Sequence, residues 1–178
     1  ETTAGATLTI NGDGGHTSLG GDAIDLDSVG GGAITITNNT ISADSFNINS
    51  SGGISLDESI TAVGTATLSA TGAITDTAGG DTDVDVQAVS LVITTAGSVG
   101  STIANALNLE VTDVTATTTG GGLFLTDPTA LEIAASGLVS GGGEIHVTAA
   151  GNLTDADATS DIDSTGAGNG GNITLEVT

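Results

Sequence analysis

The 178-residue chain contains no lysine or arginine and 22 aspartates and glutamates, which gives a formal net charge of −22 at neutral pH. Without basic side chains it cannot neutralise phosphates, and anionic lipid headgroups repel it, so nucleic acid is excluded as an electrostatic partner and so is an anionic membrane surface. Schiff-base lysines, arginine clamps, disulfides and thiolate metal sites are also excluded, because lysine, arginine and cysteine are all absent. No apolar run reaches the roughly 18 residues needed to span a bilayer, so we expect no membrane insertion.

The apolar residues are almost all short or β-branched. Hydrophobic residues make up 37% of the chain, but only two are Phe and none is Tyr, Trp or Met. A core lacking aromatics is thin, since thick cores between packed layers are normally filled by large side chains. Together with 29 glycines and a single proline, this composition predicts strands separated by turns.

Short segments of alternating apolar and polar residues recur along the chain, each typical of a strand with one buried face. In chain order they cover residues 6–10, 33–37, 53–57, 66–70, 90–94, 107–111, 123–126, 131–133, 144–148 and 172–177. Glycine and Asx clusters lie between them, at residues 11–15, 30–32, 79–81, 120–122, 141–143 and 168–171. None of the segments has the apolar stripe of a helix.

The spacing of these segments predicts the fold class. The stronger ones begin about 20 residues apart, which is the repeat length of a solenoid. We therefore expect an all-β parallel β-helix of about eight or nine rungs, continuous over residues 1–178 with no domain boundary. A β-sandwich is the alternative, but it normally requires larger core side chains than this chain has.

Residues 96–127 resemble the repeats of filamentous-haemagglutinin-like bacterial exoproteins and related β-strand-repeat surface proteins. The resemblance implies a right-handed parallel β-helix, secretion, and a role as an extended fibre or adhesin stalk at the bacterial cell surface. The rest of the chain resembles these repeats more loosely.

Two groups of aspartates are candidates for calcium binding, because Ca²⁺ takes oxygen ligands from carboxylates. Alternation predicts that Asp81, Asp83 and Asp85 share one face of a strand, with Val84 and Val86 on the other. A solvated face is the alternative interpretation. Asp25 and Asp27 flank Leu26 in the same way.

The second group begins with the spacing of a calcium loop. It contains Asp155, Asp157, Asp161 and Asp163, but it lacks the glycine and the final glutamate of an EF-hand. The cofactor prediction is therefore an optional Ca²⁺ and nothing else.

An enzymatic role is not expected. Paired carboxylates suit glycoside hydrolysis, but the chain has no aromatic platform for a sugar and no basic side chain to stabilise charge. His16 and His146 are far apart in sequence, and His146 alternates with Ile145 and Val147, which predicts an outward surface histidine.

The two terminal segments are as apolar as any interior one, and solenoids normally cap their ends. Leu8 and Ile10 at one end, and Ile173, Leu175 and Val177 at the other, are therefore predicted to be assembly rungs. We expect a structural segment of an extracellular bacterial filament whose partners are copies of itself, stacked head to tail or joined covalently. The alternative is a calcium-dependent adhesin module that binds a glycan or a host receptor.

Overall fold

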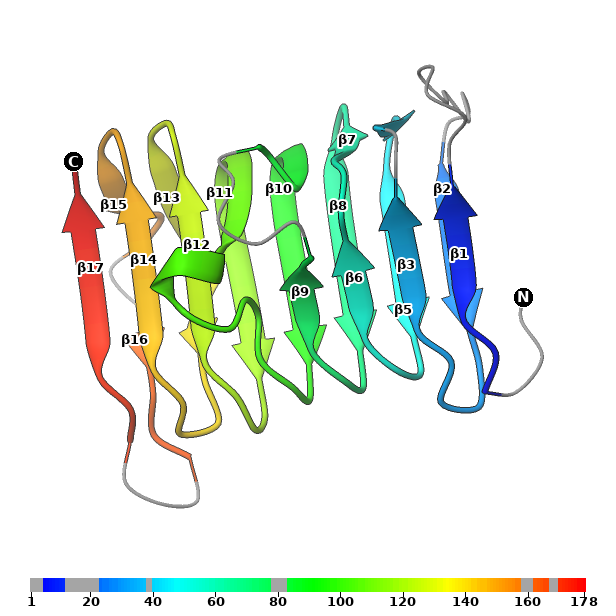
Figure 1. Cartoon of the computed structure of the whole chain (residues 1–178). Coiled ribbons are helices and arrows are strands. Elements are labelled where there is room, and N and C mark those ends of the chain that lie inside the picture. Colours follow the sequence, from blue (N-terminus) through cyan, green and yellow to red (C-terminus); the bar gives the residue numbers. More distant parts are fainter. Residues whose placement is uncertain (1–4, 12–22, 38–39, 78–82, 158–161, 167–169) are drawn as a thin grey trace.

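The computed structural model describes residues 5–11, 23–37, 40–77, 83–157, 162–166 and 170–178. Every strand pairing in this part of the chain is parallel. The chain winds as a β-solenoid whose successive strands lie side by side, with the first and last described strands at opposite ends (Figure 1). The predicted fold class is confirmed.

The solenoid has three faces. The first face contains β1 (Leu8–Asn11), β3 (Ile34–Thr37), β6 (Ile54–Leu56), β9 (Ile74–Asp76), β12 (Leu123–Asp127), β14 (Ile145–Ala149) and β17 (Ile173–Val177), and Val99 bridges β9 to β12. The second face contains β4 (Ile41–Ala43), β7 (Ile60–Ala62) and the first parts of β10 (Val86–Thr95) and β11 (Leu107–Thr118). The first part of β13 (Leu131–Val139) and its partner β15 (Leu153–Asp155) follow in the stack, but β13 pairs further along β11, with Asp113 and Val114. The third face contains β2 (Ile24–Ser28), β5 (Phe46–Ser50), β8 (Thr65–Ala70), the later parts of β10, β11 and β13, and β16 (Ile162–Asp163).

The described chain makes about six complete turns across the three faces, with β1 and β2 before them and β17 after them. The expected eight or nine rungs exceed the number of complete turns, because the rungs at the two ends of the described chain are partial. Each of the ten predicted segments lies largely within a strand. The spacing of about 20 residues underestimated the length of a turn, since register partners on the first face are up to 28 residues apart, as Ile145 and Ile173 are. Strands of three residues, such as β4 and β7, are too short to display an alternating pattern.

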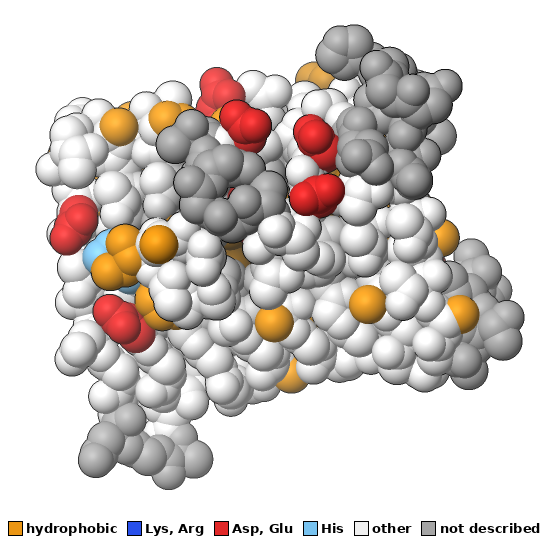
Figure 2. Space-filling model, in the orientation of Figure 1, with side chains coloured by type: hydrophobic (Ala, Val, Ile, Leu, Met, Phe, Trp, Pro, Cys, Tyr) orange, Lys and Arg blue, Asp and Glu red, His pale blue; other side chains and the backbone are white. Residues whose placement is uncertain are grey.

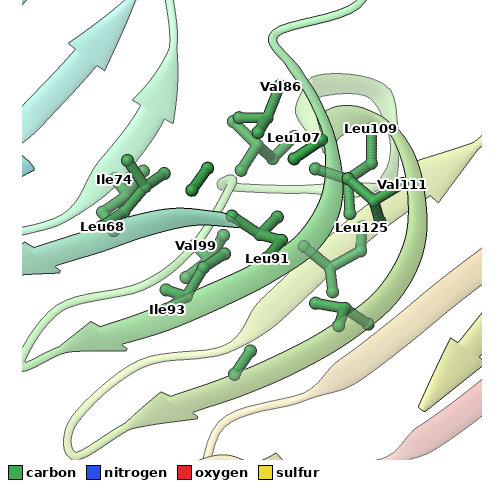
Figure 3. Close-up of a cluster of buried hydrophobic side chains, with 14 of the residues drawn as sticks. Leu68, Ile74, Val86, Leu91, Ile93, Val99, Leu107, Leu109, Val111 and Leu125 are labelled. Atoms are coloured by element: carbon green, nitrogen blue, oxygen red, sulfur yellow. The ribbon is translucent and has the colours of Figure 1, made fainter. Parts of the chain in front are cut away.

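The interior is one continuous core of short aliphatic side chains, as the composition predicted. Buried hydrophobic residues form one cluster that runs from Ile24 to Ala149, and Leu8 and Ile162 are packed against it. In the middle of the solenoid, side chains from all three faces converge on one another (Figure 3). Phe46, buried to 2% exposure, is the largest side chain in this core.

The corner between the third face and the next turn of the first face is built from a repeated pair of residue types. At the ends of successive third-face strands, buried hydroxyls donate to glycine carbonyl oxygens: Ser28 to Gly32, Ser50 to Gly53, Thr95 to Gly72, Thr118 to Gly121, Ser140 to Gly143 and Ser164 to Gly171. A Cβ added at Gly141 would lie 2.1 Å from the carbonyl oxygen of Thr119 in the preceding turn, so this position has no room for a side chain. We call these residues the hydroxyl–glycine corner.

Candidate functional site

The C-terminal strand leaves its apolar side chains uncovered. On β17, Ile173, Leu175 and Val177 are 45%, 44% and 62% exposed. Their register partners on β14, residues Ile145, Val147 and Ala149, are each 0% exposed. The two strands have the same alternation, so the difference arises because β14 is covered by a further rung and β17 pairs on one side alone.

The first strand of the solenoid is exposed in a similar way. Leu8 and Ile10 are half-buried and pair in register with Ile34 and Ile36, which are 0% exposed. Both termini of the described solenoid therefore carry aliphatic residues at an open sheet edge. These are the five residues predicted as assembly rungs.

The two ends belong to one continuous column of core residues on the first face. The column joins Leu8, Ile34, Ile54, Ile74, Val99, Leu123, Ile145 and Ile173, each paired with the next. A rung added at either end would extend this column in register. This geometry allows assembly along the solenoid axis.

In the first group of predicted calcium ligands, the two described aspartates differ in burial. Asp81 lies outside the described residues, Asp83 is exposed, and Asp85 is 5% exposed. Asp85 Oδ2 accepts a hydrogen bond of 2.7 Å from the backbone N–H of Asn108 in the next turn, so this carboxylate links two turns. The predicted alternation was wrong here, because Asp85 and Val86 are both buried at the corner that leads into β10.

The second group lies around β15 and β16. Asp161 is outside the described residues, and Asp155 and Asp157 are exposed. Asp155 accepts a hydrogen bond from the N–H of Asp157, whereas Asp163 accepts two from Thr165. The Thr165 hydroxyl and then its N–H hold the pKa of the Asp163 carboxyl below its usual value of about 3.8.

Among the described residues, no three histidine or acidic side chains come together as a metal-binding group. Two of the seven predicted ligands lie outside that part of the chain. Calcium binding therefore stays a prediction.

His146 is buried, which corrects the prediction of a surface histidine. It alternates with the core residues Ile145 and Val147, which places its side chain on the outer side of the first face, yet the residue is only 2% exposed. Figure 2 shows histidine only as a small pale blue area beside hydrophobic side chains. His146 lies between Phe124 on β12 and Thr174 on β17. Its Nε2 is 3.3 Å from the Thr148 hydroxyl and 3.9 Å from Glu176 Oε2. Neighbouring side chains on the same face thus cover a residue that alternation alone places in solvent.

The repeat is broken on the second face, which the sequence pattern did not predict. Val86 pairs with Leu109, a separation of 23 residues, whereas Asp113 pairs with Glu132, a separation of only 19. Asn108 pairs with Thr126 on β12, and Asp113 pairs with Glu132 on β13. Within described residues 83–157, the intervening residues 109–112 have no register partner in the following turn. The short turn leaves the outer surface hollowed at this point.

Asp127 closes this short turn. Its carboxylate is 1% exposed and accepts hydrogen bonds from the N–H of Val111 at 3.0 Å and from the N–H and hydroxyl of Thr129 at 2.7 and 2.6 Å. Pro128, the only proline of the chain, follows it and has no N–H to offer a sheet. The proline, and the close spacing of the segments at 123–126 and 131–133, were the available signals for the break.

Comparisons with protein-family models, with curated proteins and with solved structures give no significant match. In the described part of the chain, no helix has the length and apolar character to cross a membrane. The fold and the exposed end strands are therefore the observations from which a function is inferred.

Proposed function

We propose that this chain is a non-enzymatic structural segment of an extracellular bacterial filament or adhesin stalk, joined head to tail to further solenoid rungs. The contrast between exposed Ile173, Leu175 and Val177 and their fully buried partners on β14 carries the proposal. A rung stacked on β17 would give these side chains the environment that β17 gives to β14.

The energy available at this end is appreciable. Burying a half-exposed Ile, Leu or Val contributes about 1 kcal/mol, so covering the three side chains contributes about 3 kcal/mol. Pairing the open backbone edge of β17 adds to this, since unpaired strand edges readily accept another strand. The complementary surface is an N-terminal rung of the same kind, with Leu8 in the same column and Ile10 two residues further along the strand.

The rung that follows is supplied either by a covalent continuation or by a separate copy. In both forms the interface is heterologous, so it propagates along the axis instead of closing into a dimer. A charge of −22 per 178 residues opposes this stacking, and dissolved cations must screen it. We therefore expect stacking of separate copies to strengthen as ionic strength rises.

Location and handedness rest on the resemblance of residues 96–127 to filamentous-haemagglutinin-like exoproteins, which favours a right-handed helix exported to the cell surface. The absence of lysine and arginine agrees with an extracellular role, because trypsin-like proteases have no cleavage site in the chain.

Electron microscopy of native material tests the proposal. We expect filaments whose axial repeat is a whole number of spacings of about 4.8 Å. In the purified chain, Leu175→Lys should abolish salt-promoted assembly, measured by sedimentation velocity. Val63→Lys is the matched control, because Val63 is 72% exposed on the side of the solenoid.

Two results would contradict the proposal. One is a compact native protein in which its own loops cover both end strands. The other is a purified chain that stays monomeric at every salt concentration, from a source in which no covalent continuation of the solenoid exists.

A further inference from the structure

The break in the repeat produces a groove on the side of the solenoid, away from the end strands. Its central part, of about 470 Å³, is lined by Gln87, Val89, Glu110, Thr112 and Ala130, among others. A second hollow of about 220 Å³ shares Thr112 and Ala130 and extends the groove to Glu132, Asn152 and Thr154. The lining residues belong to successive turns, so the groove runs along the solenoid axis.

The dimensions suit an extended polymer. From Ala62 on β7 to Thr154 on β15, the lining residues span five neighbouring turns, or about 19 Å at about 4.8 Å per turn. An extended polypeptide covers this length with about six residues. The lining combines methyl-bearing side chains, such as Val89 and Ala130, with hydroxyl and carboxylate groups.

The charge of the groove is negative and has no internal counter-charge. Glu110 is half-buried, and its Oε2 accepts a hydrogen bond of 3.0 Å from Gln87 Nε2. Glu132 is also half-buried and is the register partner of Asp113 on the adjacent strand. Like charges directly opposite on neighbouring strands are destabilising, and the chain has no lysine or arginine to separate them.

We propose that this groove binds an extended segment of a different polypeptide that carries lysine or arginine side chains. Charge complementarity selects this occupant, because its cations would lie beside Glu110 and Glu132 while its backbone and aliphatic stems cover Val89 and Ala130. A second copy of this chain cannot serve, since it has no lysine or arginine. The groove is thus a lateral docking surface for a basic partner, separate from axial stacking through β1 and β17.

The probe is a fluorescein-labelled peptide of alternating lysine and threonine, about eight residues long, titrated with the purified chain and followed by fluorescence anisotropy. We expect saturable one-to-one binding that weakens with added salt. The double variant Glu110→Gln, Glu132→Gln should weaken binding by about tenfold, because each charge pair contributes up to about 1 kcal/mol. The matched control is Asp25→Asn, Asp27→Asn, which removes two charges from exposed positions on β2 and should change affinity less than about twofold.

A second variant tests the shape of the groove without changing its charge. Thr112→Tyr places a ring in the groove from an exposed position and should also weaken binding, and thermal melting checks that each variant is folded. If the groove double variant and the control double variant lose equal affinity for the peptide, the proposal is overturned, because the binding is then non-specific charge attraction. Saturable binding of a neutral hexasaccharide with none of the basic peptide would also overturn it, and would assign the groove to a glycan instead.

Discussion

Two corners of the same solenoid are built by different means. At the hydroxyl–glycine corner, a buried Ser or Thr and a glycine recur in almost every turn and hold neighbouring turns in close backbone contact. At the corner between the second and third faces, Val63 and Val89 are 72% and 51% exposed, and just beyond it the register between β11 and β13 shifts between Val114 and Ala116.

The difference shows where this fold tolerates variation in turn length. Between Val114 and Ala116 β11 has one residue, whereas between their partners Ile133 and Leu138 β13 has four, so β13 absorbs extra residues just beyond the loose corner. The hydroxyl–glycine corner keeps its bonding in the same turns, with Thr118 and Ser140 both bonded to glycine carbonyls. Irregularity and the lateral groove are therefore on the same side of the molecule.

The largest expected effect is a glycine substitution at the tight corner. Gly141→Ala should lower the free energy of unfolding by about 3 kcal/mol or more, because its Cβ would meet the backbone of Thr119 and the two turns would have to separate. The control at the loose corner is Gly64→Ala, whose Cβ would lie 3.3 Å from the carbonyl oxygen of Asp44. Gly64→Ala should lower the free energy of unfolding, measured in urea, by less than about 1 kcal/mol. Equal losses of stability in the two variants would show that the two corners are packed equally tightly.

The next effect concerns the carboxylate that closes the short turn. Asp127→Ala should lower the free energy of unfolding by about 2 to 3 kcal/mol, because it leaves the N–H groups of Val111 and Thr129 without their acceptor. Hydrogen exchange at Val111 should accelerate more than the global loss of stability explains. Asp25→Ala, at an exposed position of β2, is the control and should be neutral within about 0.5 kcal/mol. Unchanged exchange at Val111 would mean that Asp127 does not hold the turn.

Single hydroxyls at the tight corner should contribute less. Thr118→Val removes one buried hydrogen bond to Gly121 and should cost about 1 kcal/mol, whereas Thr117→Val on the outer side of the same strand should cost little. Ala70 occupies the same column between Ser50 and Thr95 without a hydroxyl. Ala70→Ser should therefore raise the free energy of unfolding by about 0.5 kcal/mol. A destabilising Ala70→Ser would show that the column does not favour a hydroxyl in every turn.

The smallest effect is a pH dependence at Asp163. Folding lowers the pKa of this carboxyl below about 3.8, so its contribution to stability is complete above that pH and is lost as the pH falls through the folded value. Asp163→Asn should give a slightly lower melting temperature than wild type at pH 6, and the difference should disappear toward pH 2. Thr165→Val, which removes the hydroxyl donor, should reproduce part of the effect. A difference that persists at pH 2 would assign the effect to something other than ionisation.

Local sequence patterns were sufficient to predict the fold class and most of the strands. Alternation such as that of residues 144–148 identifies strands because the side-chain period of a strand is 2, and regularly spaced glycines mark the turns. The small aliphatic composition determined a thin core, which the burial of Leu68, Ile93 and Val147 confirms. The class of fold and most of its strands were therefore readable without coordinates.

Only the tertiary structure decided features that depend on which turns become neighbours. His146 and Asp85 have the sequence pattern of surface residues, but both are buried because side chains and backbone from adjacent turns cover them. The number of turns and the short turn at Asp127 depend on register across about 20 residues, which no local pattern encodes. Alternation determines which way a side chain points relative to its own strand, whereas burial depends on what the neighbouring turns place over it.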